Sequence, residues 1–272
     1  MSTDISVRSF AVTDVGRRRK ANEDSFLRNE DLNLFVVADG MGGYAAGDVA
    51  SAEAVESIYG MVLRNKAQID AFIEKPTRES ARQIKRLLES AVQSACYMIF
   101  GLAEMSPERH GMGTTISSLL LAGNFGATAQ VGDSRVYCVR DGAAIQLTED
   151  HTLVNWQVRE GIITPEQALT SPHRNVITRA VGNKDFVQVD TQIFQVRVGD
   201  QFLLCSDGLH GYLDDEEIPY ILGFGIEEAG RKFIELANNR GGKDNITAVL
   251  VEAYQSAAAK AAAHRTTAPP EM

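Results

Sequence analysis

The sequence predicts an α+β fold: a central antiparallel β-sandwich flanked by helices on both sides, in four αββα layers, with a flap insertion. Segments with strand-like alternation lie at both ends of the chain, and two pairs of helical stretches lie between them. No repeat or internal linker divides the 272 residues. With 44% hydrophobic and 23% charged residues, the composition is that of a globular protein with a full core. Two sheets packed face to face beneath helices satisfy this pattern.

The first half of the chain carries two strands and then two helices, predicted over 5–12, 33–38, 45–63 and 77–104. The strand segments alternate between apolar and polar residues. The second helical stretch carries Leu88, Ala91 and Ala95 at helical spacing. Lys75-Pro76 predicts a break between the two helices.

The second half returns to strands, predicted over 114–122, 127–131, 135–140, 187–196, 201–205 and 246–252. Asp141-Gly142 is a strong hairpin signal after the third of these. Two shorter helices near 214–222 and 226–238 precede the last strand. The segment 149–182 is irregular and partly helical, which predicts a flap inserted between strands.

These elements predict one domain over 1–254, with the flap at about 149–182 inside it. The remaining residues, 255–272, are Ala-rich and end in Pro-Pro-Glu-Met without apolar periodicity. Such a composition predicts a flexible C-terminal tail.

Charge and cysteine content exclude several classes of protein. The net charge is -9 and the sequence pI is about 5.1, so the chain lacks the basic excess of a nucleic-acid-binding protein. The cysteines, Cys96, Cys138 and Cys205, are too far apart for a metal clip and odd in number, which predicts buried free thiols. No segment has the length of a membrane span or the apolar core of a signal peptide. We therefore expect a soluble cytoplasmic protein that binds neither nucleic acid nor membrane.

Acidic residues recur at strand ends and tight turns, in five clusters. Asp39, Asp133 and Asp207 share one arrangement, in which an apolar strand ends at a carboxylate with a glycine beside it. Carboxylates that converge from strand ends suit Mg²⁺ or Mn²⁺, and two such ions can activate a water for attack on phosphorus. A single Asp-Gly is more often only a turn. Five such clusters in one chain favour a metal site.

A short basic run precedes the first acidic cluster, Arg17-Arg18-Arg19-Lys20. Such a run is most often a solvated face. Beside an acidic metal site, a guanidinium can also bind two phosphate oxygens, and at most one of the three arginines would point inward.

The ordered set of motifs closely resembles the protein phosphatase 2C family of metal-dependent Ser/Thr phosphatases, in its bacterial form. The resemblance covers residues 5–253 and rests on Gly16-x-x-Arg19-x-x-Asn22-Glu23-Asp24, Asp39-Gly40-Met41-Gly42-Gly43, Gly111-Met112-Gly113-Thr114-Thr115, Gly132-Asp133-Ser134-Arg135, Ser206-Asp207-Gly208-Leu209 and Asp244-Asn245-Ile246-Thr247. Any one motif is weak, whereas the set in this order is specific. It implies the same sandwich fold and a flap that influences substrate access.

The resemblance also implies a two-metal core that holds Mn²⁺ or Mg²⁺. Asp39 matches the carboxylate that bridges both ions, and the Gly40 carbonyl matches a ligand of the second. Asp207 and Asp244 match ligands of the first ion.

The outer positions follow from the same resemblance. Glu23 matches a position that reaches the second ion mainly through water, and Asp24 matches a residue that orients metal-bound water. Arg19 matches the phosphate-binding arginine. Asp133 matches a ligand of a third, weaker ion seen in bacterial members.

Four positions differ from the family pattern. Tyr44 and Met41 stand where members carry histidine, so no histidine in this loop is available to protonate the leaving oxygen. Gly211 replaces an aspartate that helps to hold the third ion, which predicts a weakened third site with Asp133 and Asp207 only. Asp48 stands where related bacterial sequences have Glu and is interpreted as a polar residue in the first turn of a helix.

Three other histidines, His151, His173 and His210, are candidates for the general acid, although each is better explained by a surface or flap role. The expected activity is hydrolysis of phosphoserine and phosphothreonine in proteins by a metal-bridging water, reversing a bacterial Ser/Thr kinase and acting on that kinase or its targets. Two alternatives are a non-catalytic phosphoprotein-binding module and a metal-dependent phosphodiesterase or nuclease. The intact Asp39, Asp207 and Asp244 argue against the first, and the motif order argues against the second.

Overall fold

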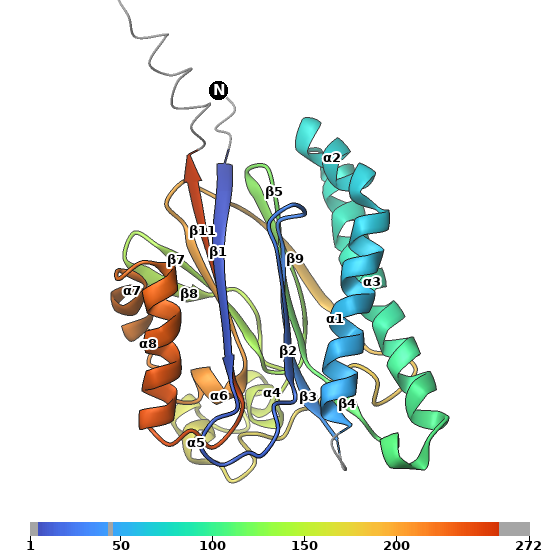
Figure 1. Ribbon diagram of the computed structural model, residues 1–272, viewed down its shortest axis with the longest axis vertical. Helices are drawn as coiled ribbons and strands as arrows, with labels where there is room; N and C mark the ends of the chain where they lie inside the picture. The colour runs from blue at the N-terminus through green and yellow to red at the C-terminus, as the bar shows by residue number, and fades with distance from the viewer. Residues whose placement is uncertain (1–4, 43–45, 256–272) are drawn as a thin grey trace, which may run out of the picture.

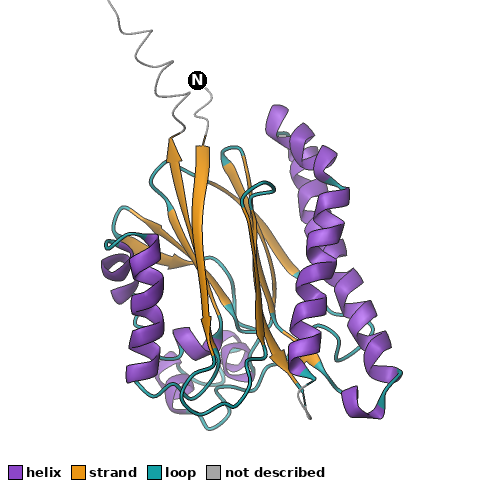
Figure 2. Ribbon diagram, viewed as in Figure 1, coloured by secondary structure: helices purple, strands orange, loops and turns teal. Residues whose placement is uncertain are grey.

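The computed structural model describes residues 5–42 and 46–255, and it places two antiparallel sheets face to face. Helices lie outside both sheets (Figures 1 and 2). The predicted αββα sandwich is therefore confirmed.

The first sheet joins the two ends of the described chain. Its strand order is β1 (Ile5–Asp14), β11 (Ile246–Gln255), β10 (Gln201–Cys205), β7 (Arg135–Arg140) and β8 (Ala143–Gln146). Strands β1 and β11 pair over their whole length, with Ile5 opposite Gln255 and Asp14 opposite Ile246. The β7–β8 hairpin turns at Asp141 and Gly142, both with positive φ, as the sequence predicted.

The second sheet contains a strand that the sequence did not reveal. Its order is β2 (Asp24–Asn29), β3 (Leu34–Met41), β5 (Ile116–Ala122), β6 (Phe125–Val131) and β9 (Asp190–Gln195), with β4 (Gly113–Thr114) paired to β3. Strand β2 has only two apolar residues, Phe26 and Leu27, and burial alternates weakly along it. Its pairing with β3 therefore decides its conformation more than its own pattern does. That pairing puts Asp24 opposite Asp39.

Long helices cover the second sheet, namely α1 (Gly47–Arg64), α2 (Lys66–Glu74) and α3 (Arg78–Glu104), with the short 3₁₀ turn η1 (Pro107–Arg109) after them. Helix α3 begins at the predicted residue because Thr77 and Ser80 form a reciprocal capping box. Helix α2 was missed, since it lies in the short stretch interpreted as the break before Pro76. The first sheet is covered by α7 (Glu217–Leu222) and α8 (Ile226–Asn239).

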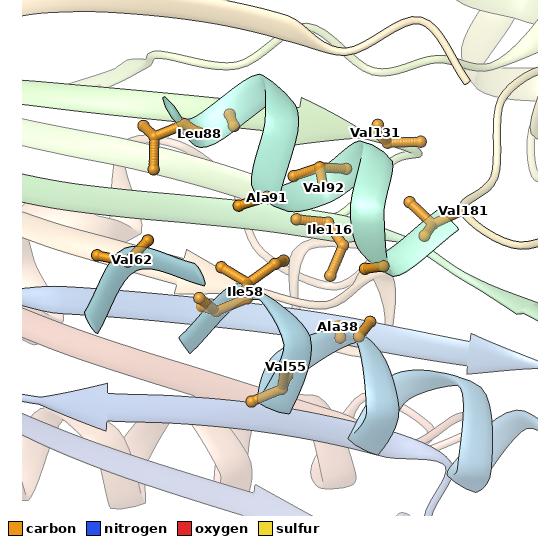
Figure 3. Packing of buried hydrophobic residues seen from close by; sticks show 14 of the residues in the cluster. Ala38, Val55, Ile58, Val62, Leu88, Ala91, Val92, Ile116, Val131 and Val181 are labelled. Atoms are coloured by element: carbon orange, nitrogen blue, oxygen red, sulfur yellow. The ribbon is translucent and has the colours of Figure 1, made fainter. Parts of the chain in front are cut away.

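Three layers of apolar side chains hold these elements together. Along β3 the side chains alternate, so that Val36 and Ala38 face α1 and α3 while Phe35 and Val37 fill the space between the sheets. Figure 3 shows the helical side of this packing, where Ile58 of α1 and Val92 of α3 lie near Ile116 of β5. A similar layer beneath α7 and α8 is centred on the buried Phe233. The central strands β3, β5, β10 and β11 are buried on both faces along most of their length, whereas β1, β2, β8 and β9 are only partly buried.

The segment predicted as a flap contains α4 (Leu153–Arg159) and α5 (Pro165–Thr170) joined by irregular chain. Its base is closed by isolated bridges between Thr152 and Ile177 and between Thr114 and Val181. The short α6 (Asp207–His210) lies at the same end of the molecule (Figure 1). The predicted tail lies outside the described residues except for Gln255, which ends β11.

Two further expectations concern cysteines and membranes. Cys96, Cys138 and Cys205 are buried free thiols, as predicted. Among the described residues, no helix is both long enough and apolar enough to span a bilayer.

The packing predicts how two leucine truncations differ. Leu88 is 1% exposed in the layer between α3 and the second sheet, whereas Leu63 is 45% exposed on α1. We expect Leu88→Ala to lower the free energy of unfolding by about 2–5 kcal/mol, because it leaves a cavity, and Leu63→Ala to lower it by less than about 1 kcal/mol. Urea unfolding followed by circular dichroism measures both. Equal losses would contradict this packing.

Candidate metal centre

One end of the sandwich gathers the acidic residues that the motifs singled out. Strands β1, β3 and β10 end there, and β2 and β11 begin there, because neighbouring strands are antiparallel (Figure 1). The side chains concerned are called the acidic cluster below: Glu23, Asp24, Asp39, Asp133, Asp207 and Asp244. They are separated by up to 221 positions in sequence, counted from Glu23 to Asp244, so the sheet register alone brings them together.

Asp24 and Asp39 form the centre of the cluster as opposite residues of β2 and β3. Asp24 Oδ2 accepts hydrogen bonds from Ser206 Oγ at 2.8 Å and from Thr247 Oγ1 at 2.6 Å. The other oxygen, Asp24 Oδ1, is buried without a hydrogen-bond partner, as is Asp207 Oδ1. Unpartnered buried carboxylate oxygens are costly, and a bound cation would satisfy them.

Glycines let the backbone segments approach each other closely around this centre. A Cβ on Gly40 would lie 2.0 Å from the carbonyl oxygen of Gly47, and a Cβ on Gly208 would lie 1.9 Å from that of Asn245. Gly40 also donates its amide to the Glu23 carbonyl at 3.1 Å. Any larger residue at 40 or 208 would push apart the loops that carry the acidic cluster.

Glu23 and Asp244 lie at the open side of the cluster. The Glu23 carboxylate lies close to Gly47 at the start of α1, where an added Cβ would be 2.9 Å from it. Asp244 forms a 2.8 Å ion pair with Arg19, and both side chains are partly exposed. Of the three arginines in the basic run, Arg19 is therefore the one that points toward the site. The sequence predicted that at most one of them would do so.

Asp133 is 7% exposed on the turn between β6 and β7. His151 fixes this turn, because its Nδ1 accepts the Gly132 amide at 3.1 Å. The neutral ring therefore carries its proton on Nε2, which donates to Asp190 Oδ2 at 3.0 Å. Burial lowers the pKa of His151, which keeps the ring neutral. The residue ties the Asp133 turn to the base of the flap.

His210 contacts the same turn from α6. Its Nε2 donates to the Asp133 carbonyl oxygen at 2.9 Å, and burial lowers its pKa well below the usual value. His151 therefore has a structural role at the base of the predicted flap, and His210 has one on α6, outside that flap, whereas His173 is exposed on the flap. Gly211 follows α6, where an added Cβ would lie 2.9 Å from the Asp207 carbonyl oxygen.

Burial and mutual repulsion raise the pKa values within the acidic cluster. Burial raises the pKa of Asp24 to about 6 and that of Asp133 to about 7, and the charge of Asp207 adds to each. Burial followed by the charges of Asp24 and Asp207 raises the pKa of Asp39 well above its ordinary value. Burial and the charge of Asp244 raise the pKa of Asp207. The cluster therefore resists full ionisation unless positive charge is supplied.

The donor set fits hard divalent cations. All candidate ligands are oxygens, including the carbonyl of Gly40, and two buried carboxylate oxygens lack partners. Within 5–42 and 46–255, no three His, Cys, Asp or Glu side chains form a ready-made cage. Such an open arrangement suits Mg²⁺ or Mn²⁺, which keep several waters as ligands.

Comparison with known proteins agrees with this geometry. The family model described as Protein phosphatase 2C matches residues 16–251. The chain belongs to the protein phosphatase 2C family. It is a serine/threonine protein phosphatase of the 2C type, and this family is metal-dependent.

Similar proteins support the assignment over most of the phosphatase. It is 38% identical over 245 residues to the serine/threonine phosphatase stp of Listeria welshimeri, covering 88% of this chain and 93% of that protein. The crystal structure of the Mycobacterium tuberculosis serine/threonine phosphatase PstP/Ppp matches with a TM-score of 0.80 at 36% identity, over 92% of this chain and 99% of that one. The catalytic domain of PstP in complex with two manganese ions matches with a TM-score of 0.78 at 35% identity, over 92% and 100% of the two chains.

Several residues that build the phosphatase site had no predicted role. Asn245 holds the loop between β1 and β2 in place. Its Oδ1 accepts the Glu23 amide at 2.8 Å, and its Nδ2 donates to the carbonyls of Val15 and Ala21. Thr115 Oγ1 accepts the Asp39 amide at 3.0 Å. With Ser206 and Thr247, these residues are polar positions on buried apolar strands or at their ends. A polar residue within or next to an apolar strand is the sequence signal that could have identified them.

The raised pKa values predict an unusual pH dependence for the metal-free phosphatase. In the folded state Asp24 and Asp133 titrate at about 6 and about 7, above their unfolded values, so folding favours their protonated forms. Their contribution to stability is complete below about pH 4 and is lost as the pH rises through about 6 to 7. We therefore expect stability in the presence of a chelator to fall by on the order of 3 kcal/mol between about pH 5 and pH 8.

Urea unfolding at both pH values measures this change. The stability of Asp133→Asn should fall less between these pH values, because one of the two titrating groups is absent. Added Mn²⁺ should restore the stability of the unchanged protein at the higher pH. Stability of the metal-free protein that rises over this range would contradict the assignment.

Proposed function

We propose that the chain hydrolyses phosphoserine and phosphothreonine in proteins, with two Mn²⁺ or Mg²⁺ ions held by Asp39, the Gly40 carbonyl, Asp207 and Asp244. One observation carries the proposal: the acidic cluster converges beside Arg19 and includes two buried carboxylate oxygens without partners. Glu23 is assigned to the second ion through water, as the sequence suggested. When bound, such a pair of cations supplies an activated bridging water and offsets charge on the phosphate oxygens.

The side chains of the protein then have separate tasks. Asp24 orients a water, because its Oδ2 is fixed by Ser206 and Thr247 while its Oδ1 remains available. Arg19 is paired with Asp244 across a partly exposed contact. A cation bound to Asp244 would replace Arg19 as its partner. The Arg19 guanidinium would then be free to bind two phosphate oxygens in a bidentate way.

The proton for the leaving serine or threonine oxygen is assigned to water. Met41 is the last residue of β3, and Tyr44 lies outside the described residues. Both ring nitrogens of His151 are engaged in hydrogen bonds, and burial lowers the pKa of His210 well below its usual value. Both residues are therefore poor proton donors.

The substrate is proposed to be a phosphorylated protein, namely a bacterial Ser/Thr kinase or its targets. This step rests on analogy with the relatives named above. The segment 149–182 is proposed to act as a flap on substrate access, and 255–272 as a flexible tail. A cytoplasmic location stays a prediction.

A single substitution tests catalysis. Asp39→Asn removes the proposed bridging carboxylate with little change in size, and we expect at least an approximately 100-fold loss of turnover of p-nitrophenyl phosphate and of a phosphothreonine peptide with Mn²⁺. The matched control is Asp48→Asn, on the exposed first turn of α1, which should retain activity. Unfolding should show Asp39→Asn at least as stable as the unchanged metal-free protein, because repulsion is relieved. Phosphopeptide bound without turnover by the unchanged protein would favour a binding module instead.

The third metal position has its own test. We propose that Asp133 and Asp207 alone hold a third ion weakly, because residue 211 lacks a carboxylate. Gly211→Asp should bind an additional Mn²⁺ about tenfold more tightly in a calorimetric titration. Gly211→Asn is the control, since it has the same size and the same close approach to the Asp207 carbonyl. Identical metal dependence in all three proteins would count against a role for this position.

A further inference from the structure

A group of positive side chains borders the proposed catalytic site without being used by it. We call this group the basic rim: Arg17, Arg18, Lys20 and Lys243. All are exposed, and they flank Arg19 and Asp244 directly in sequence. They come from the β1–β2 loop and from the loop before β11.

Close backbone contacts hold the two loops of the basic rim side by side. The Arg17 amide donates to the Gly242 carbonyl at 2.7 Å. A Cβ on Gly16 would lie 2.2 Å from the Asp244 carbonyl oxygen, which leaves room only for glycine there. The basic rim is thus fixed next to the Arg19–Asp244 pair rather than carried on a separate surface.

No carboxylate in the described part of the chain pairs with the side chains of the basic rim. Arg18, Lys20 and Lys243 make no side-chain hydrogen bond or ion pair with residues 5–42 or 46–255, and Arg17 donates only to the neutral Asn239 at 3.2 Å. Several other arginines are matched by carboxylates, as in Arg140–Asp200 and Arg240–Glu217.

The acidic residues nearest to the basic rim are already engaged. Asp14 accepts hydrogen bonds from the Gly16 amide and from Asn238, and Asp244 is paired with Arg19. Glu23 lies against Gly47 at the start of α1, and Asp48 is in the first turn of that helix, where it accepts the Val49 amide. In a chain of net charge -9, local positive charge at this one border favours negative partners that the rest of the surface repels.

We propose that the basic rim binds negative groups next to the phosphorylated residue, so that the preferred substrates are peptides with acidic side chains or a second phosphate beside the phosphoserine or phosphothreonine. This inference rests on the proposed function, because Arg19 must lie at the phosphate for the basic rim to lie along the flanking peptide. The rim acts on recognition and leaves the chemical step to the acidic cluster.

Peptide kinetics test the inference with Mn²⁺-loaded full-length protein. The substrates are three phosphothreonine peptides of equal length, flanked on both sides by Glu, Gln or Lys. The variant Arg18→Gln/Lys20→Gln/Lys243→Gln removes three rim charges. The control Arg64→Gln/Lys75→Gln/Arg78→Gln removes three exposed charges near α2, at the opposite end of the molecule (Figure 1).

For the unchanged protein, we expect kcat/KM to be about tenfold higher for the Glu-flanked than for the Gln-flanked peptide, mainly through KM. The rim variant should lose this preference, and the control should keep it. The preference should shrink at high salt, because exposed charges are screened beyond about 10 Å at 0.1 M ionic strength. Turnover of p-nitrophenyl phosphate, which has no flanking groups, should be equal in all three proteins.

Each other outcome overturns a defined step. Equal kcat/KM for the Glu and Gln peptides, or a preference that survives in the rim variant, overturns the assignment of the basic rim. A preference lost equally in the control would show that net charge alone is responsible, which also overturns it. If the unchanged protein did not hydrolyse p-nitrophenyl phosphate at all, the proposed function itself would be contradicted.

Discussion

Mutual repulsion among carboxylates at one end of the sandwich is the constraint on which the rest of the site depends. Asp24, Asp39 and Asp207 lie in partly or fully buried positions, and burial raises the pKa of each. The surrounding structure opposes that repulsion by covalent and packing rigidity, since each carboxylate is carried by a strand end anchored in a continuous core. The site is thus arranged for positive charge before any cation or phosphate binds.

The neighbouring polar residues have a common task under this constraint. Ser206 and Thr247 satisfy one oxygen of Asp24, and Asn245 clamps the loop that carries Glu23. Thr115 joins the Asp39 amide to Ser134, beside the Asp133 turn, through a 2.7 Å hydroxyl contact. His151 extends the connection to the flap. Because these groups are buried and satisfied, a change at one of them would move several carboxylates together.

Membership in the protein phosphatase 2C family and the geometry of the site support each other. The acidic cluster contains the oxygen donors that we propose hold the cations, and Arg19 forms an ion pair with one of them, Asp244. In our proposal the basic rim contacts the peptide that flanks the phosphorylated residue, whereas Arg19 contacts the phosphate itself. Opposite charges a few residues apart are stable here because glycines at 16, 40 and 208 fix the loops that separate them.

The sequence by itself determined the sandwich, most strand and helix positions and the acidic residues of the site, because apolar periodicity and motif order are local properties. It did not reveal β2 or α2, whose short segments take their conformation from neighbours. Only the tertiary structure decided that Asp24 lies opposite Asp39, that Arg19 rather than Arg17 or Arg18 pairs with Asp244, and that His151 and His210 serve the Asp133 turn. These facts depend on strand register and on contacts between separate segments of the chain, 225 positions apart for Arg19 and Asp244, which no local pattern encodes.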